Sequence, residues 1–141
     1  MPVDDYDRPL PETSADSLPY WRGLAAHELR LQRCSGCGAL RHYPRPLCPH
    51  CHSFDCDWLV ASGRGTVHSW TVAHHAFHPG FKRAVPYAIV TVDLVEGVRM
   101  AAPLAGPADT PLAIGQAVVL DFVDATPDLT LPCFRLDPAH G

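Results

Sequence analysis

The chain has 141 residues, of which 47% are hydrophobic and 18% charged, and its formal net charge is -4. Its length suits one full domain or two small ones. The negative balance argues against a general nucleic-acid binder and against a protein that adsorbs to anionic membranes. No apolar run approaches the roughly 20 residues of a membrane-spanning helix, and the acidic N-terminus lacks the apolar core of a secretion signal. We therefore expect a cytoplasmic protein with neither a membrane nor a nucleic acid as its partner.

The N-terminal residues predict a flexible tail followed by one helical segment. Residues 1–15 are acidic, contain prolines and lack periodic apolar positions, which is typical of a loosely attached tail. The helical segment covers residues 16–28, with Ser17 as a cap and a proline in its first turn. Tyr20 and Trp21 share one face of this helix, and we expect them to pack on the rest of the chain or on a partner.

The strongest chemical signal lies in residues 29–56, where two Cys-x-x-Cys pairs follow two short predicted strands. Each pair forms a tight turn that directs both sulfurs toward one point, and four thiolates at one point make a tetrahedral metal site. So small a unit buries little apolar surface, so the metal supplies its folding free energy. We interpret this stretch as a zinc ribbon with four ligands: Cys34, Cys37, Cys48 and Cys51.

Other interpretations of the four cysteines remain. Two disulfides are the weaker one, because a thiol-rich chain without a secretion signal meets a reducing cytosol. Iron is possible as well as zinc, because an all-sulfur tetrahedral site as in rubredoxin suits both. A closed shell of four thiolates leaves no open position for catalysis. Cys56 and Cys133 are left over and are expected to be buried or idle thiols.

The remainder, residues 57–138, predicts an OB-fold domain. Segments rich in β-branched and aromatic residues recur at 57–61, 66–72, 87–94, 98–104, 117–123 and 131–136. Five or six short strands in about 80 residues are typical of a small closed barrel of the OB type, and a sandwich is the alternative. The predicted fold is therefore mainly β: a short N-terminal helix, a rubredoxin-like zinc ribbon and a five- to six-stranded OB-fold barrel.

A long loop, residues 74–86, separates the second and third of these strands. It holds three histidines, two phenylalanines and an adjacent lysine–arginine pair. Long loops in small barrels carry binding more often than stability. We therefore expect small-molecule contact, if it occurs, at this loop.

Three groups of motifs resemble one known family. The first is Tyr20-Trp21 ahead of the stretch 29–38, the second is the stretch 44–51, and the third is 62–67 with Pro86-Tyr87 and 96–99 downstream. In this order they resemble the acyl-CoA-associated OB-fold family (DUF35), whose members carry a rubredoxin-like zinc ribbon. The resemblance covers roughly residues 18–137 and carries over the four cysteines as metal ligands, but no catalytic residue.

The resemblance implies a function as well as a fold. Members of the family are accessory partners of thiolase-like enzymes, including thiolases and lipid-transfer-protein-type aldolases, and some help to shape the CoA or acyl channel. We therefore expect a hetero-oligomer, no activity of the chain alone and no organic cofactor. The expected docking residues lie on the aromatic helix and the arginine-bearing ribbon: Tyr20, Trp21, Arg41 and Arg45.

Three other functions stay open as alternatives. In a stand-alone acyl-CoA-binding module, Lys82 and Arg83 would meet the CoA phosphates, and Phe77 and Phe81 would line the acyl path. A nucleic-acid-binding OB-fold is disfavoured, because the sequence from residue 58 onward contains five Lys and Arg residues but seven Asp and Glu residues, a net negative charge. A rubredoxin-like electron carrier would require iron at the four cysteines.

Overall fold

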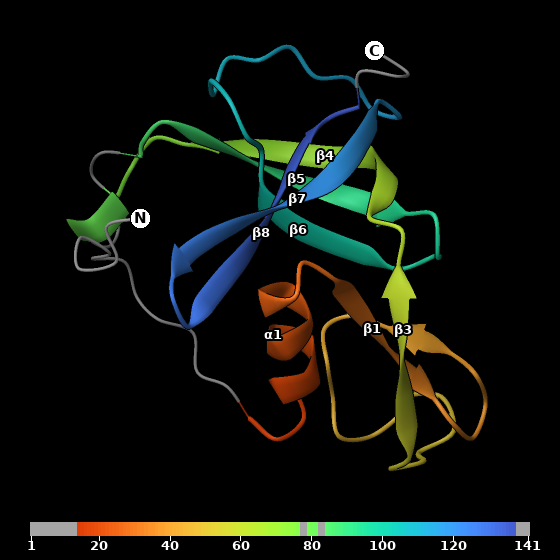
Figure 1. Ribbon diagram of the computed structural model, residues 1–141. Helices are drawn as coiled ribbons and strands as arrows, with labels where there is room; N and C mark the ends of the chain where they lie inside the picture. Colours follow the sequence, from red (N-terminus) through yellow and green to blue (C-terminus); the bar gives the residue numbers. More distant parts are fainter. Residues whose placement is uncertain (1–13, 77–78, 82–83, 138–141) are drawn as a thin grey trace.

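The computed structural model of the chain describes residues 14–76, 79–81 and 84–137. It is mainly β with one short helix, as the sequence predicts (Figure 1). No helix in the described part is long and apolar enough to cross a membrane. The elements are α1 (Leu18–Ala25), β1 (Leu29–Cys34), β2 (Leu40–Arg41), β3 (Cys56–Ala61), β4 (Arg64–Ala73), the 3-10 helix η2 (Pro79–Phe81), β5 (Tyr87–Leu94), β6 (Arg99–Pro103), β7 (Ala117–Thr126) and β8 (Leu129–Leu136).

The first three strands form the sheet of the ribbon. β1 lies in the middle, and β2 and β3 pair with it antiparallel on its two sides. Sequence reasoning assigned residues 57–61 to the OB-fold domain. In the structure Asp57 is the register partner of Arg33 and Ala61 that of Leu29, so this strand completes the ribbon sheet. Local alternation identifies a strand, whereas its partner depends on contacts between distant residues.

The remaining strands form a second antiparallel sheet in the order β6-β5-β4-β7-β8. β4 pairs with β5 along most of its length but with β7 only at Arg64–Thr66, so the two halves of the sheet diverge. At the other side, Leu104, the residue after β6, forms one isolated parallel bridge with Phe134 of β8. The OB-like architecture is confirmed, but the sheet is not the closed barrel that was expected.

One glycine allows β4 and β5 to lie close together. A Cβ atom on Gly65 would stand 2.6 Å from the carbonyl oxygen of Asp93 and 2.6 Å from Cγ1 of Val92. Any side chain at this position would therefore force the two strands apart. The chain turns just before, at Gly63 (φ 81°), and Gly65 already lies inside β4.

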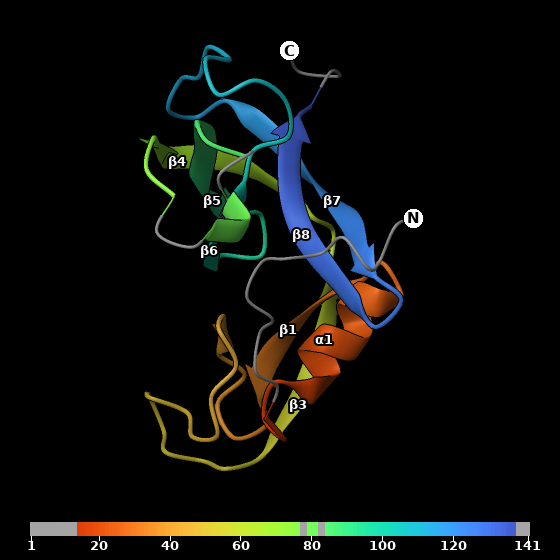
Figure 2. The same ribbon diagram turned by 90° about the vertical axis from the view of Figure 1, so that its left-hand side faces the viewer.

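A single hydrophobic core joins the helix, the ribbon and the five-stranded sheet. Tyr20 and Leu24 of α1 and Leu29 and Leu31 of β1 belong to the same buried cluster as the inward residues of β4–β8. Figures 1 and 2 show α1 lying between the β7–β8 hairpin and the ribbon strands. The ribbon is therefore fixed to the OB-like sheet by shared apolar burial, which favours one orientation of the two units.

The sequence of α1 explains its contact with β1. Ser17 takes the N-cap position, as predicted, although its hydroxyl accepts a bond from the amide of Ser14 (2.9 Å) and makes no cap bond to the helix. A Cβ on Gly23 would stand 2.8 Å from the side chain of Arg30 and 3.0 Å from the carbonyl oxygen of Glu28. The glycine that weakens the helix is thus the residue that lets β1 return beside it.

His42 is a partly buried titratable group at the junction of α1 and the ribbon, and its two ring nitrogens are shielded from solvent. Its ring centroid lies 5.2 Å from that of Tyr20 and 4.0 Å from that of Tyr43. Neither of its ring nitrogens has a hydrogen-bond partner in the described structure. Burial lowers the pKa of His42 from 6.5 to about 4. The fold therefore accepts the neutral imidazole and resists its protonation.

This environment predicts a pH dependence of stability. Between pH 6.5 and about 4 the unfolded chain binds a proton at His42 that the folded chain does not, so the free energy of unfolding falls as the pH falls. We expect His42→Leu to remove this component. Between neutral pH and about pH 5, wild type should lose roughly 2 kcal/mol more stability than the variant. Urea unfolding at both pH values measures the difference, and equal losses in both proteins would contradict the assignment.

Candidate metal centre

The first cysteine knuckle is a tight turn that begins where β1 ends. The amide of Cys34 donates to the carbonyl of Ala39, and the amide of Gly38 donates back to the carbonyl of Cys34, both at 2.9 Å. The amide of Gly36 donates to the sulfur of Cys34 at 3.3 Å. Gly38 has a φ of +79°, which favours glycine. The turn brings Cys37 back beside Cys34.

The second knuckle repeats this geometry fourteen positions later. The amide of Cys48 donates to the carbonyl of Ser53, and the amide of His52 donates to the carbonyl of Cys48, both at 3.0 Å. The amide of His50 donates to the sulfur of Cys48 at 3.4 Å. His52 occupies the position that corresponds to Gly38 and also has a positive φ, +64°. The two knuckles are thus a structural repeat in which one left-handed position is not glycine.

The two knuckles bring all four predicted sulfurs together. Sγ of Cys34 lies 3.4 Å from Sγ of Cys51, and Sγ of Cys37 lies 3.7 Å from Sγ of Cys48. All four sulfurs lie within 4.8 Å of one another. A metal with tetrahedral bonds of about 2.3 Å holds its sulfur ligands about 3.8 Å apart. The donor set therefore fits a tetrahedral ion, and zinc and iron both suit it.

Backbone amides at the two knuckles favour thiolates. The amide of Cys37 is the main cause that lowers the pKa of Cys34 to about 6, with the thiol of Cys51 and the amide of Gly36 adding to it. The amide of Cys51, followed by that of His50, lowers the pKa of Cys48. These two sulfurs are buried, whereas those of the other two ligands belong to exposed residues. The deprotonated form that a metal needs is therefore supported at the buried side of the site.

The structure separates the four residues that the sequence assigned to docking. Tyr20 belongs to the core, where burial raises its pKa. Arg41 is only 9% exposed, and its guanidinium bonds to Gln32 and to the carbonyl of Arg45. Trp21 is half-buried, and the side chain of Arg45 is exposed. Trp21 and Arg45 therefore keep surface that a partner could contact.

The candidates for ligand contact lie mostly beyond the described structure. Phe77, Lys82 and Arg83 fall outside the described residues. The backbone of Phe81 closes the 3-10 helix η2. Their assignment to CoA or substrate contact stays a prediction.

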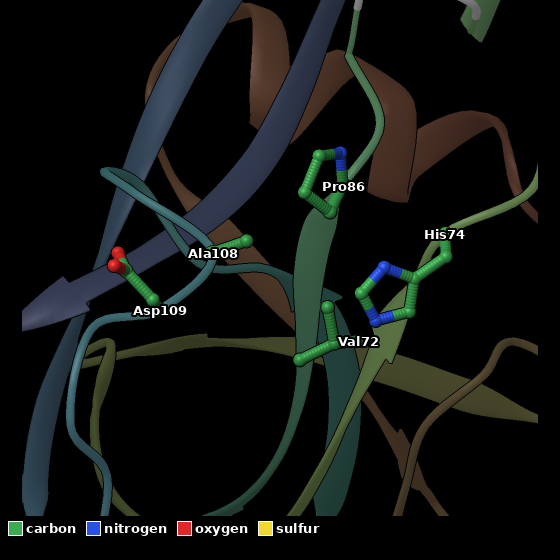
Figure 3. A pocket seen from close by; sticks show the side chains of 5 residues that line it. All are labelled: Val72, His74, Pro86, Ala108 and Asp109. Atoms are coloured by element: carbon green, nitrogen blue, oxygen red, sulfur yellow. The ribbon is translucent and has the colours of Figure 1, made fainter.

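An open depression lies beside the ends of the loop that carries these residues. It has a volume of about 580 Å³ and is lined by Val72, His74, Pro86, Ala108 and Asp109. Figure 3 shows His74 and Pro86 on one side and Ala108 and Asp109 on the other. The sequence predicted ligand contact only on the side of the depression that includes His74 and Pro86. The loop that carries Asp109 was missed, although Gly106, Pro107 and Pro111 mark it as an irregular segment.

Comparison with known proteins gives two close curated relatives. The chain is 45% identical over 128 residues to the "Probable enoyl-CoA hydratase alpha subunit" of Thermomonospora curvata. It is 42% identical over 127 residues to the "3-oxo-4,17-pregnadiene-20-carboxyl-CoA hydratase alpha subunit" of Mycobacterium tuberculosis. These alignments cover 91% and 90% of this chain but 40% of each relative. The chain thus spans about two fifths of the length of these relatives.

A solved structure matches over nearly its whole length. It is described as "Ltp2-ChsH2(DUF35) aldolase", and its matching chain is 44% identical to this one with a TM-score of 0.81. The match covers 90% of this chain and 98% of that chain. Both the ribbon and the OB-like sheet therefore have a counterpart of known structure.

The repeated knuckle predicts opposite effects of two substitutions. Gly38→Ala places a Cβ at a positive φ and should lower stability by about 1 kcal/mol, whereas His52→Gly removes such a strain and should raise it by a similar amount. Thermal unfolding of the metal-loaded protein measures both. The backbone account is wrong if the two variants shift the melting temperature in the same direction.

Two family models match adjoining parts of the chain. The "ChsH2, rubredoxin-like zinc ribbon domain" matches residues 21–57, and the "ChsH2, C-terminal OB-fold domain" matches residues 58–123. Together with the four-sulfur cluster and the five-stranded sheet, they identify both structural units. The chain therefore belongs to the DUF35 family of proteins that join a ChsH2-type zinc ribbon to an OB-fold domain.

Proposed function

We propose that the chain is a non-catalytic accessory subunit that binds and supports an acyl-CoA enzyme of the thiolase or lipid-transfer-type aldolase class. The observation that carries this proposal is the likeness to a chain of the Ltp2-ChsH2(DUF35) aldolase. The match has 44% identity and covers 98% of that chain. The names of the two relatives, both hydratase subunits, refer to CoA thioesters as substrates, which supports a role beside an acyl-CoA enzyme. Their own activities belong to proteins much longer than this chain.

The chemistry of the metal centre agrees with a supporting role. Four sulfurs fill a tetrahedral shell, so a bound zinc ion would keep no position for water or substrate. Such an ion acts by holding the two knuckles together. The ribbon then presents a fixed surface that includes the exposed side chain of Arg45, and the half-buried Trp21 lies on the adjoining helix α1.

The proposal predicts a stable complex with a thiolase-like protein. When the chain is co-expressed with such a protein encoded nearby, the two should co-purify and the enzyme should be more active than alone. Arg45→Glu should weaken the association roughly fivefold, because a reversed charge at a protein interface costs about 1 kcal/mol or more. Arg64→Glu on β4 is the matched control and should bind like wild type. If no thiolase-like protein is retained or affected, the proposed function fails.

A second function has one observation in its favour. The depression beside residues 74–86 is of the size that small molecules occupy and is lined by apolar side chains with one imidazole and one carboxylate. We infer that an acyl-CoA could place its acyl chain there, with Lys82 and Arg83 as the candidates for its phosphates. This role is compatible with the first, because an accessory subunit could complete an acyl channel.

The depression can be tested by filling it. Ala108→Phe should lower the affinity for a long-chain acyl-CoA about tenfold, because a large side chain would occupy the volume that the acyl chain needs. Ala113→Phe, at an exposed position, is the control and should leave binding unchanged. Isothermal titration calorimetry with acetyl-CoA and a long-chain acyl-CoA measures both. The absence of heat for wild type at millimolar ligand would remove this second function for the isolated chain.

A further inference from the structure

A buried polar cluster lies inside the ribbon, between β1 and the segment that leads into the second knuckle. Gln32 is 2% exposed and Arg41 is 9% exposed. Arg41 is the only charged side chain that is buried among the residues that the structure describes. It has no carboxylate partner there, and its Nη1 atom has no hydrogen-bond partner in the described part of the chain. A buried cation without a counter-charge is costly, so this arrangement needs a physical reason.

The cluster connects four segments of the ribbon. Oε1 of Gln32 accepts bonds from Nε of Arg41 at 2.6 Å and from the amide of Arg45 at 2.8 Å. Nε2 of Gln32 donates to the sulfur of Cys56 at 3.3 Å. Nη2 of Arg41 donates to the carbonyl of Arg45 at 3.1 Å. One amide and one guanidinium thus join β1, β2, β3 and the segment that leads into the second knuckle.

The position of these bonds relates them to the metal centre. Gln32 lies two residues before Cys34, and its amide touches Cys56, the register partner of Cys34. Arg45 lies three residues before Cys48. Residues 43–47 belong to no strand, and their backbone hydrogen bonds in the described structure are those to Gln32 and Arg41. The cluster therefore holds the approach to the second knuckle against the strand that ends in the first.

We propose that Gln32 and Arg41 are positioning residues for the metal, and that Arg41 is the counter-charge of the metal centre. A divalent ion with four thiolates carries two negative charges, and Arg41 is a permanent cation within the same small unit. When a metal binds, the bonds of the cluster form together with the metal centre and help to hold the second pair of sulfurs near the first. After it binds, the guanidinium offsets the excess negative charge. Residues next to metal ligands commonly tune metal affinity in this way.

Metal affinity and cobalt spectra test the proposal on the full chain. Arg41→Met removes the charge and the bonds but keeps the length, and the affinity for Zn²⁺ in competition with a chromophoric chelator should fall about 10- to 100-fold. Arg33→Met on the same sheet is the matched control, because Arg33 pairs with exposed Asp57 (2.9 Å), and its affinity should stay within about twofold of wild type. An unchanged affinity in Arg41→Met, or an equal loss in Arg33→Met, overturns the proposal.

A second variant separates charge from packing and does not depend on how well Arg41→Met folds. Gln32→Glu keeps the acceptor for the bonds from Arg41 and Arg45 and loses only the donor to Cys56, which is not a metal ligand. A purely structural cluster would therefore bind metal about as tightly as before. If Arg41 is the counter-charge, the new carboxylate neutralises it and the affinity for Zn²⁺ should fall about tenfold. With Co²⁺, the sulfur-to-cobalt charge-transfer absorption should keep its tetrahedral form but saturate at higher metal concentration. Unchanged or tighter binding in Gln32→Glu overturns the role of charge.

Discussion

The convergence of four cysteine sulfurs is the constraint on which the ribbon depends. The chain from Ala39 to Asp55 contains a strand of two residues and no helix, so secondary structure alone holds little of it in place. Its order comes from two knuckles whose sulfurs approach to 3.4 and 3.7 Å, a spacing that suits one ion. Structural zinc sites of this kind contribute about 10–16 kcal/mol at neutral pH, which is enough to order a segment that buries few apolar side chains. Metal binding by the four cysteines therefore supplies the free energy that folds this segment.

Three contacts tie the ribbon to the OB-like sheet. α1 packs between them and contributes to a core that also contains Leu29 and Leu31 of the ribbon. His27, just after the helix, lies 4.8 Å from the ring of Phe122 and 3.0 Å from a carboxylate oxygen of Asp124 on β7. The hydroxyl of Tyr43 accepts the amide of Ala101 on the outer edge of β6, at 3.1 Å. That contact also covers an edge that would otherwise offer a free backbone donor.

The sequence predicted what depends on local chemistry. Two Cys-x-x-Cys pairs with nearby glycines were sufficient for the metal centre, and the alternation of residues 87–94 was sufficient for β5. Features that depend on distant partners were missed. Residues 57–61 were expected in the barrel but pair with β1. The sheet stays open because its outer strands, β6 and β8, form no ladder in the described structure, where the isolated bridge of Leu104 with Phe134 is the pairing on that side. Arg41 was expected at a docking surface, and nothing local in the sequence shows that it is buried and bonded to Gln32. Asp109 was missed because its loop has no motif, only a position opposite His74 in space (Figure 3).

The most direct test of a structural metal centre is to compare the amide NMR spectrum of the metal-loaded chain with that of the chain after removal of the metal by a chelator, together with the metal content. The account predicts one equivalent of tetrahedral metal per chain. On its removal, the resonances of the two knuckles and of residues 43–47 should collapse to unfolded positions, and those of β4 to β8 should persist. Reloading with Zn²⁺ should restore the native spectrum. A chain that lacks metal yet keeps the knuckle resonances fully dispersed would contradict the claim that a metal holds the ribbon together.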